Sequence, residues 1–115
     1  MKTPVQITET LQDKALYSLN NKTFKEVCIG GILAGTFVSI AASTSITVCA
    51  DMARYFGTGF TKLISGIVFS LGLILIIISG GELFTGSNLF ITAYYKDQSL
   101  WKRLLWFWLI VYIFN

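Results

Sequence analysis

The chain has 115 residues, of which 54% are hydrophobic and 13% are charged, and its net charge is +3. Globular domains have roughly 45 to 50% apolar and about 25% charged residues, so this composition excludes an ordinary soluble domain. The basic residues form no run of five or more, which argues against nucleic-acid binding. The apolar residues gather in long stretches, as lipid-facing helices require. We therefore expect an all-α membrane protein with a cytoplasmic leader at residues 1–24 and a transmembrane region at residues 25–115.

The leader has the pattern of a short amphipathic helix. Thr3 and Pro4 are typical of a helix start, and Leu11, Ala15 and Leu19 recur every four residues among polar neighbours. The apolar stripe would lie either on the membrane interface or on the cytoplasmic end of the helical bundle, and the sequence leaves both open.

The first spanning helix is expected at about residues 27–50, a stretch about 36 Å long at 1.5 Å per residue. Gly31, Gly35, Ser39 and Ser43 recur every four residues. They predict a face without bulk, where the backbone of another helix can approach closely. A water path lined by the hydroxyl groups of this region is the alternative.

The basic residues predict the orientation in the membrane. Four lysines precede the first apolar run, Lys96, Lys102 and Arg103 follow the second, and only Arg54 and Lys62 lie between the two runs. By the positive-inside rule the N-terminus is cytoplasmic, and the connection between the first two spanning helices faces outward. We expect a multi-pass protein of the cell inner (plasma) membrane.

The second apolar region, at about residues 62–95, is too long for one straight helix. It would measure about 51 Å, against a hydrocarbon core of about 30 Å. Its middle contains Gly80, Gly81 and Gly86 together with a carboxylate, Glu82. These residues predict a break in the helix. Breaks at membrane depth are tolerated only where the freed backbone is buried in protein or lines a water-filled cavity, and they mark substrate sites in transporters.

The third apolar run, at about residues 101–115, begins with an aromatic cluster that includes Trp101, Trp106 and Trp108 and is typical of an interfacial belt. Its residues reach only about 22 Å, so this helix is expected to be cut short. We expect the chain to be a truncated piece of a longer protein.

Enzymatic and metal chemistry find no basis in the sequence. The chain has no histidine, and its two cysteines, Cys28 and Cys49, lack a Cys-x-x-Cys spacing. A single intramembrane carboxylate offers no paired acid and base. We expect no enzyme activity, no metal site and no cofactor.

The segment Ile77–Gly86, with the sequence Ile-Ile-Ser-Gly-Gly-Glu-Leu-Phe-Thr-Gly, resembles the first signature of the formate/nitrite transporter family. The resemblance extends to Phe69–Leu73 before the break, and to Val111, Tyr112 and Asn115 in the third helix. It implies the first inverted repeat of an aquaporin-like six-helix channel, in which a pore loop breaks the second helix. The full-length protein would be a homopentamer with one pore in each subunit.

The resemblance also implies roles for individual residues. Leu83, Phe84 and Thr85 match the constriction and gate of the pore, and Phe69 and Leu73, one helical turn apart, match residues that narrow it from the outer side. A second set braces the loop through turns, close packing and hydrogen bonds. The members of this set are Gly80, Gly81, Glu82, Gly86, Asn88 and Asn115.

An anion that passes an apolar constriction loses hydration at a large cost, which something must offset. Candidates are the hydroxyl of Thr85, backbone N–H groups freed near Gly86 and Ser87, and the positive end of the restarted helix. Protonation of a weak acid in transit would also serve. In the family this role belongs to a histidine of the second repeat, which this chain lacks. We expect Glu82 to be structural, with its carboxylate bound by loop N–H groups, because a negative charge repels an anion.

Together these observations predict a membrane channel or transporter for small monovalent anions, with formate as the first choice, working passively or with a proton. Nitrite and hydrosulfide are the alternative substrates within the same family. A non-transporting truncated membrane fragment is the alternative of a different class. The expected partners are the anion, the lipid bilayer and further copies of the subunit.

Overall fold

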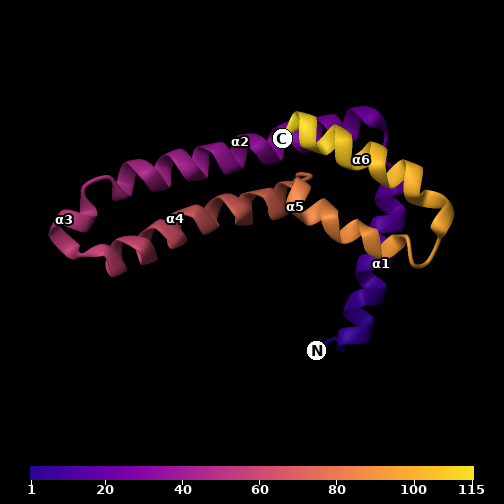
Figure 1. The fold of residues 1–115 in the computed structure, drawn as a ribbon, viewed down its shortest axis with the longest axis horizontal. Helices are drawn as coiled ribbons and strands as arrows, with labels where there is room; N and C mark the ends of the chain where they lie inside the picture. The colour runs from indigo at the N-terminus through magenta and orange to yellow at the C-terminus, as the bar shows by residue number, and fades with distance from the viewer.

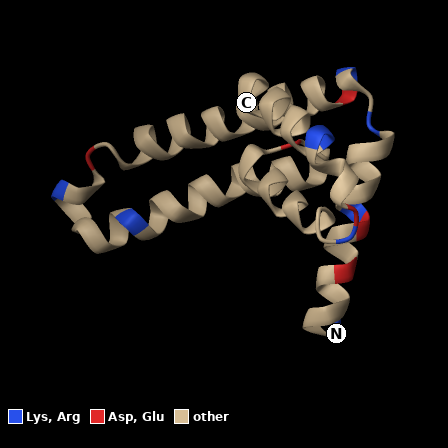
Figure 2. Cartoon of the chain, turned by 45° about the vertical axis from the view of Figure 1, so that its right-hand side comes forward, with Lys and Arg blue, Asp and Glu red and all other residues tan.

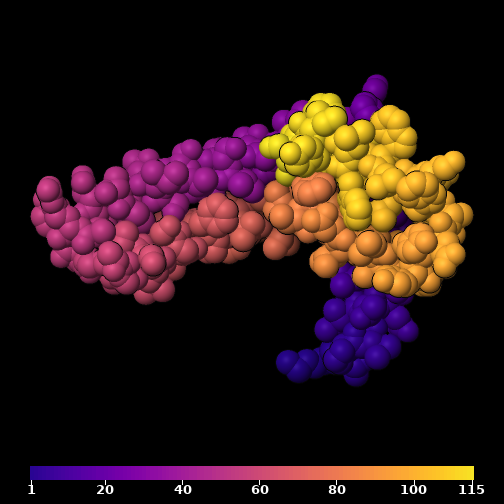
Figure 3. Space-filling view, in the orientation of Figure 1, coloured from indigo at the N-terminus to yellow at the C-terminus, as the bar shows by residue number.

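The computed structural model describes residues 1–115, and all of its regular secondary structure is helical (Figure 1). An elongated arm leads to a broader end, from which the N-terminal helix projects, and the whole measures 56 × 34 × 20 Å (Figure 3). The α-helices are α1 (Pro4–Asn21), α2 (Phe24–Cys49), α3 (Met52–Phe56), α4 (Thr58–Ser79), α5 (Phe84–Ser87) and α6 (Trp101–Phe114). Two 3-10 helices, η1 (Asn88–Ala93) and η2 (Gln98–Leu100), lie between α5 and α6.

The arm is an antiparallel hairpin of α2 and α4, connected through α3 (Figure 1). Small residues bring the two helices together. A Cβ atom at Gly72 would overlap the Cβ atom of Ala41, so the two backbones are close at this point. Nearer to α3, the hydroxyl oxygens of Ser45 and Ser65 lie 2.7 Å apart and form a hydrogen bond between the helices.

The face of α2 that was predicted to be free of bulk is only half covered, and by α6 rather than α4. Gly31 and Gly35 are buried, and a Cβ atom at Gly35 would overlap the backbone of Asn115. Ser39 and Ser43 are exposed. The close contact with α4 lies instead on the side of α2 that contains Ala41, and close packing on the two serines stays a prediction.

The leader helix α1 packs on the broad end of the molecule. The Thr3 hydroxyl accepts a hydrogen bond from the Gln6 N–H, and the Gln6 side chain accepts one from the Thr3 N–H, so a capping box starts the helix. Ala15 and Leu19 are buried against η1 and α6, so their stripe lies on the bundle. The remaining members of this core cluster are Val27, Phe90, Ala93, Leu104, Phe107 and Val111.

Most of the apolar surface of α2 and α4 is uncovered. Both helices are long and apolar enough to span a membrane, and only 28% and 11% of their most apolar windows are buried. Side chains such as Ile46, Ile67 and Ile77 are exposed. Because contiguous apolar surface of this extent is unfavourable in water, the two helices are suited to a lipid environment.

Candidate functional site

The site begins where α4 ends. The chain leaves the helix at Gly80, whose φ of +69° lies in the left-handed region that glycine adopts without strain. The N–H of Gly81 donates to the carbonyl oxygen of Ile76 at 3.0 Å and closes the last turn. The chain then continues without helical structure until α5 begins at Phe84. The helix is thus interrupted within the segment where its glycines predict a break.

The backbone of this loop is held on both sides by neighbouring helices. The Glu82 N–H donates to the carbonyl oxygen of Gly30 at 3.0 Å. The side-chain amide of Asn115 donates to the carbonyl oxygens of Glu82 at 2.8 Å and Gly31 at 3.2 Å. A Cβ atom at Gly30 would lie only 3.0 Å from the Glu82 Cγ, so the loop packs tightly against α2 there. Asn115 therefore ties the loop to α2.

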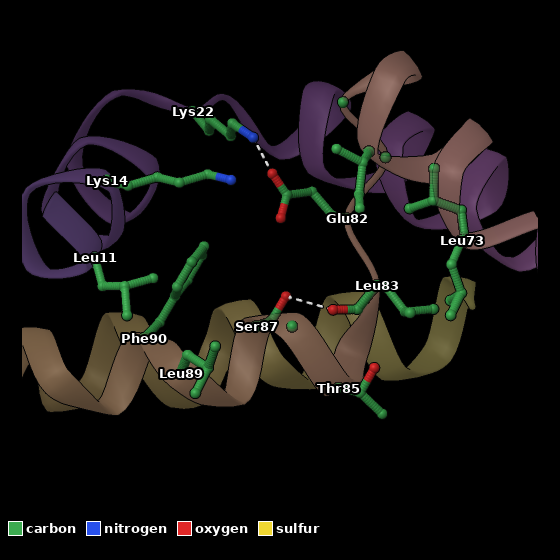
Figure 4. Close-up of a pocket in the computed structure, with 15 residues that line it drawn as sticks. Leu11, Lys14, Lys22, Leu73, Glu82, Leu83, Thr85, Ser87, Leu89 and Phe90 are labelled. Carbon is green, nitrogen blue, oxygen red and sulfur yellow. Dashed lines mark hydrogen bonds and ion pairs between the residues drawn. The ribbon is translucent and has the colours of Figure 1, made fainter. Parts of the chain in front are cut away.

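The carboxylate of Glu82 forms an ion pair with Lys22, which lies in the corner between α1 and α2 (Figure 4). The Glu82 side chain is 10% exposed and that of Lys22 is 24% exposed. The expectation that loop N–H groups would bind this carboxylate is wrong, because the leader supplies a cation instead. A buried carboxylate without such a partner would be strongly unfavourable.

A cavity of about 450 Å³ opens between the leader, the end of α4, the loop and the segment that follows it (Figure 4). Leu73, Leu83 and Thr85, three of the five predicted pore residues, line it. Its charged groups are Lys14, Lys22 and Glu82. Its lining also includes four predicted bracing residues, namely Gly80, Gly81, Glu82 and Gly86.

Thr85 supplies a hydroxyl group without a partner to this cavity. Its side chain is exposed and makes no hydrogen bond, whereas the hydroxyls of Thr36, Thr44 and Thr47 in α2 each donate to the carbonyl oxygen four residues earlier at 2.8 Å. The Thr85 hydroxyl is therefore free to donate to a solute in the cavity.

The other predicted residues lie elsewhere. The Phe84 ring packs edge-on against the Tyr112 ring, with 5.4 Å between their centroids, and adds to the core on the α6 side. Phe69 lines a separate hollow with Lys62, towards the α3 end of the hairpin. Asn88 is exposed, and its side chain makes no hydrogen bond. The grouping of Phe69 and Phe84 with the other pore residues is thus not found around this cavity.

Sequence reasoning missed the structural role of Ser87. This residue is 1% exposed, and both its N–H and its hydroxyl donate to the carbonyl oxygen of Leu83, at 2.9 and 3.0 Å. Its own carbonyl oxygen accepts from the Trp108 indole at 2.8 Å. The Ser87 N–H is therefore not free to bind an anion, contrary to expectation. The contact of Ser87 with Trp108 and that of Lys22 with Glu82 depend on the fold, and no local pattern marks them.

Comparison with known proteins matches nearly the whole chain. The formate/nitrite transporter family matches residues 5–115. The chain belongs to this family. It is 34% identical over 116 residues to the formate channel FocA of Haemophilus influenzae. This match covers 98% of this chain and 39% of that protein. FocA of Escherichia coli K12 is 33% identical over 112 residues, with 97% of this chain and 39% of the relative covered.

A more distant relative within the formate/nitrite transporter family is the formate channel BtFdhC of Bacillus thuringiensis, 30% identical over 109 residues and covering 92% of this chain and 41% of that protein. The chain thus spans about two fifths of the length of these relatives. No solved structure matches it. The relatives in these comparisons are named as formate channels.

Proposed function

We propose that this chain forms part of the conducting path of a small-anion channel, and that formate is its substrate. The observation that supports this most directly is the interrupted helix at Gly80. In a chain of the formate/nitrite transporter family, the interruption leaves Leu83 and the unpartnered hydroxyl of Thr85 on the wall of one cavity. Three relatives named as formate channels favour formate over nitrite and hydrosulfide.

The chemistry of this cavity suits the passage of a weak acid anion. Leucine side chains remove water from the anion, at a cost that favours small and weakly hydrated ions. The Thr85 hydroxyl replaces part of the lost hydration with a charge-assisted hydrogen bond. In our proposal the complete protein adds a second inverted repeat, whose groups face Thr85 across the aquaporin-like pore loop. Transport is then passive or accompanied by a proton.

The charge distribution supports an orientation with α1 in the cytoplasm. Arg54 and Lys62 are the basic residues at the α3 end, and the others gather around α1 and the start of α6 (Figure 2). By the positive-inside rule the α1 end faces the cytoplasm. We further propose that the complete protein is a homopentamer in the inner (plasma) membrane, with one pore in each subunit.

The function is tested by flux measurements on the complete protein that contains this chain, reconstituted into liposomes. Formate is expected to enter these liposomes faster than protein-free liposomes of the same lipid. Nitrite and hydrosulfide, measured in the same way, rank the substrates. If none of the three anions enters faster than through lipid alone, the channel proposal is wrong.

The role of the Thr85 hydroxyl is tested by Thr85→Val, which keeps the shape of the side chain and removes its donor. Formate flux is expected to fall by roughly tenfold or more, the size of a hydrogen bond to a charged group. Thr85→Ser should keep most of the flux. Thr92→Val is the matched control, because the Thr92 hydroxyl already donates to the carbonyl oxygen of Leu89 at 2.8 Å. Equal flux in Thr85→Val and Thr92→Val would exclude a role for this hydroxyl.

A further inference from the structure

The ion pair between Lys22 and Glu82 poses a question that the proposed function does not answer. The Glu82 carboxylate stands in the wall of the cavity, next to Leu83 and three residues before Thr85. A bare carboxylate at this place would repel any anion that reaches the threonine. Its charge must therefore be balanced if the cavity is to admit anions.

Lys22 is held where it can balance that charge. The Lys22 N–H donates to the Ser18 carbonyl oxygen at 3.3 Å, and α1 ends there. The next residue, Thr23, starts α2 with a capping box, in which the Thr23 N–H donates to the Glu26 side chain. The Lys22 backbone thus lies in a corner fixed by two helices. Its side chain reaches from this corner to Glu82 (Figure 4).

Lys22 is the cation that pairs with Glu82 in this structure. Lys14 of α1 points into the same cavity but forms no ion pair, so the cavity wall holds two cations and one anion (Figure 4). The carboxylates of the surrounding elements are engaged elsewhere: Glu26 caps α2, and Asp13 pairs with Lys96 at 3.0 Å. Removing Lys22 would therefore take away the direct partner of Glu82 and leave Lys14 as the remaining cation on the cavity wall.

We propose that Lys22 is a positioning residue that masks the charge of Glu82, so that an anion in the adjoining cavity meets no net negative charge from the loop. This proposal rests on the anion-channel function proposed above. Lys22 acts through Glu82 and does not bind the anion. The pair lets the loop keep an acidic side chain that joins it to the leader, while the cavity stays open to anions.

The test is the concentration dependence of formate uptake by liposomes that contain the complete protein. Lys22→Met exposes the carboxylate and is expected to raise the KM for formate about tenfold, the effect of a like charge within about 10 Å at a protein surface. Glu82→Gln leaves the Lys22 charge unbalanced and is expected to lower the KM a few-fold. The double variant Lys22→Met/Glu82→Gln should fall between the two. Lys25→Met is the matched control, because Lys25 is exposed and forms no ion pair.

The opposite signs of the two single substitutions separate masking from simple anchoring. If the pair only anchors the loop, Lys22→Met and Glu82→Gln both impair uptake, and that result overturns the proposal. Glu82→Gln alone also decides the question where Lys22→Met fails to assemble in detergent, because an impaired Glu82→Gln overturns masking and an increased affinity supports it. A wild-type protein without formate flux would instead refute the channel function itself.

Discussion

The contact between α2 and α4 can be tested by adding one methyl group at Gly72. A Cβ atom at this position would overlap the Cβ atom of Ala41 and lie 3.1 Å from the carbonyl oxygen of Phe37. Both atoms are fixed to the backbone of α2, so neither can swing aside as the end of a long side chain could. We therefore expect Gly72→Ala to force the two helices apart and to destabilise the protein.

The size of the effect follows from two opposing contributions. Overpacking costs about 1–3 kcal/mol. Replacing a glycine with alanine inside a helix recovers about 1 kcal/mol of helix propensity. Gly66→Ala is the matched control, because Gly66 lies in the same helix and a Cβ atom there would meet nothing within 4 Å. The two variants share the propensity gain, so their difference in unfolding free energy, about 1–3 kcal/mol, measures the overpacking alone.

Denaturant unfolding of the complete protein in detergent provides the assay. A second substitution, Ala41→Gly, removes the atom that the new methyl group would meet. We expect the double variant Ala41→Gly/Gly72→Ala to be more stable than the sum of the two single effects, with a coupling of about 0.5–3 kcal/mol. If Gly72→Ala is as stable as Gly66→Ala, or if Ala41→Gly brings no relief, the helices do not touch as described.

Three further predictions concern the loop, the connection before α6 and the leader. Gly80→Ala is expected to cost about 1–2 kcal/mol of unfolding free energy, because φ is +69° there, and Gly86→Ala, with open space and no positive φ, should cost less; equal losses would argue against the left-handed turn. Hydrogen bonds from the hydroxyl and N–H of Ser99 lower the pKa of Asp97 below its ordinary value of 3.8, so this carboxylate contributes stability above pH 3.8 that is lost as the pH falls through the lowered pKa. Ser99→Ala should raise the pKa of Asp97 in an NMR titration, and an unchanged pKa would contradict this cause. Thr3→Ala removes the cap of α1 and should destabilise its first turn by about 1 kcal/mol, which faster amide exchange confined to that turn would reveal.

Local signals in the sequence were enough to place the break in the second spanning region. Two adjacent glycines followed by a carboxylate are unfavourable in a simple lipid-facing helix, and Gly80 indeed adopts a backbone conformation that other residues avoid. The helix starts were predicted less well. The α2 helix begins at Phe24, three residues before the first expected residue, because Thr23 and Glu26 form a capping box that the apolar pattern alone does not reveal.

The composition of the site could not be predicted in the same way, because it depends on contacts across the chain. Lys22 was interpreted only as one of several basic residues that set the orientation, and its partner Glu82 lies 60 positions away. Only the corner between α1 and α2 brings the two together. A charge near a loop acid therefore has to be located in space before its function can be argued.

The break also explains why Phe84 lies apart from Leu73, Leu83 and Thr85 in this structure. In a continuous helix, the direction of each side chain would follow from its number of residues after Leu73. The non-helical residues before α5 change the direction of all the side chains that follow. The new directions are set by the anchors of the loop, which are the hydrogen bonds that the Glu82 backbone makes with Gly30 and Asn115. With these anchors in place, Thr85 lies among the residues that line the cavity, while Phe84 packs on α6. A change at an anchor should therefore alter the cavity more than an exchange of one apolar wall residue for another, since it would turn all the residues that follow the break.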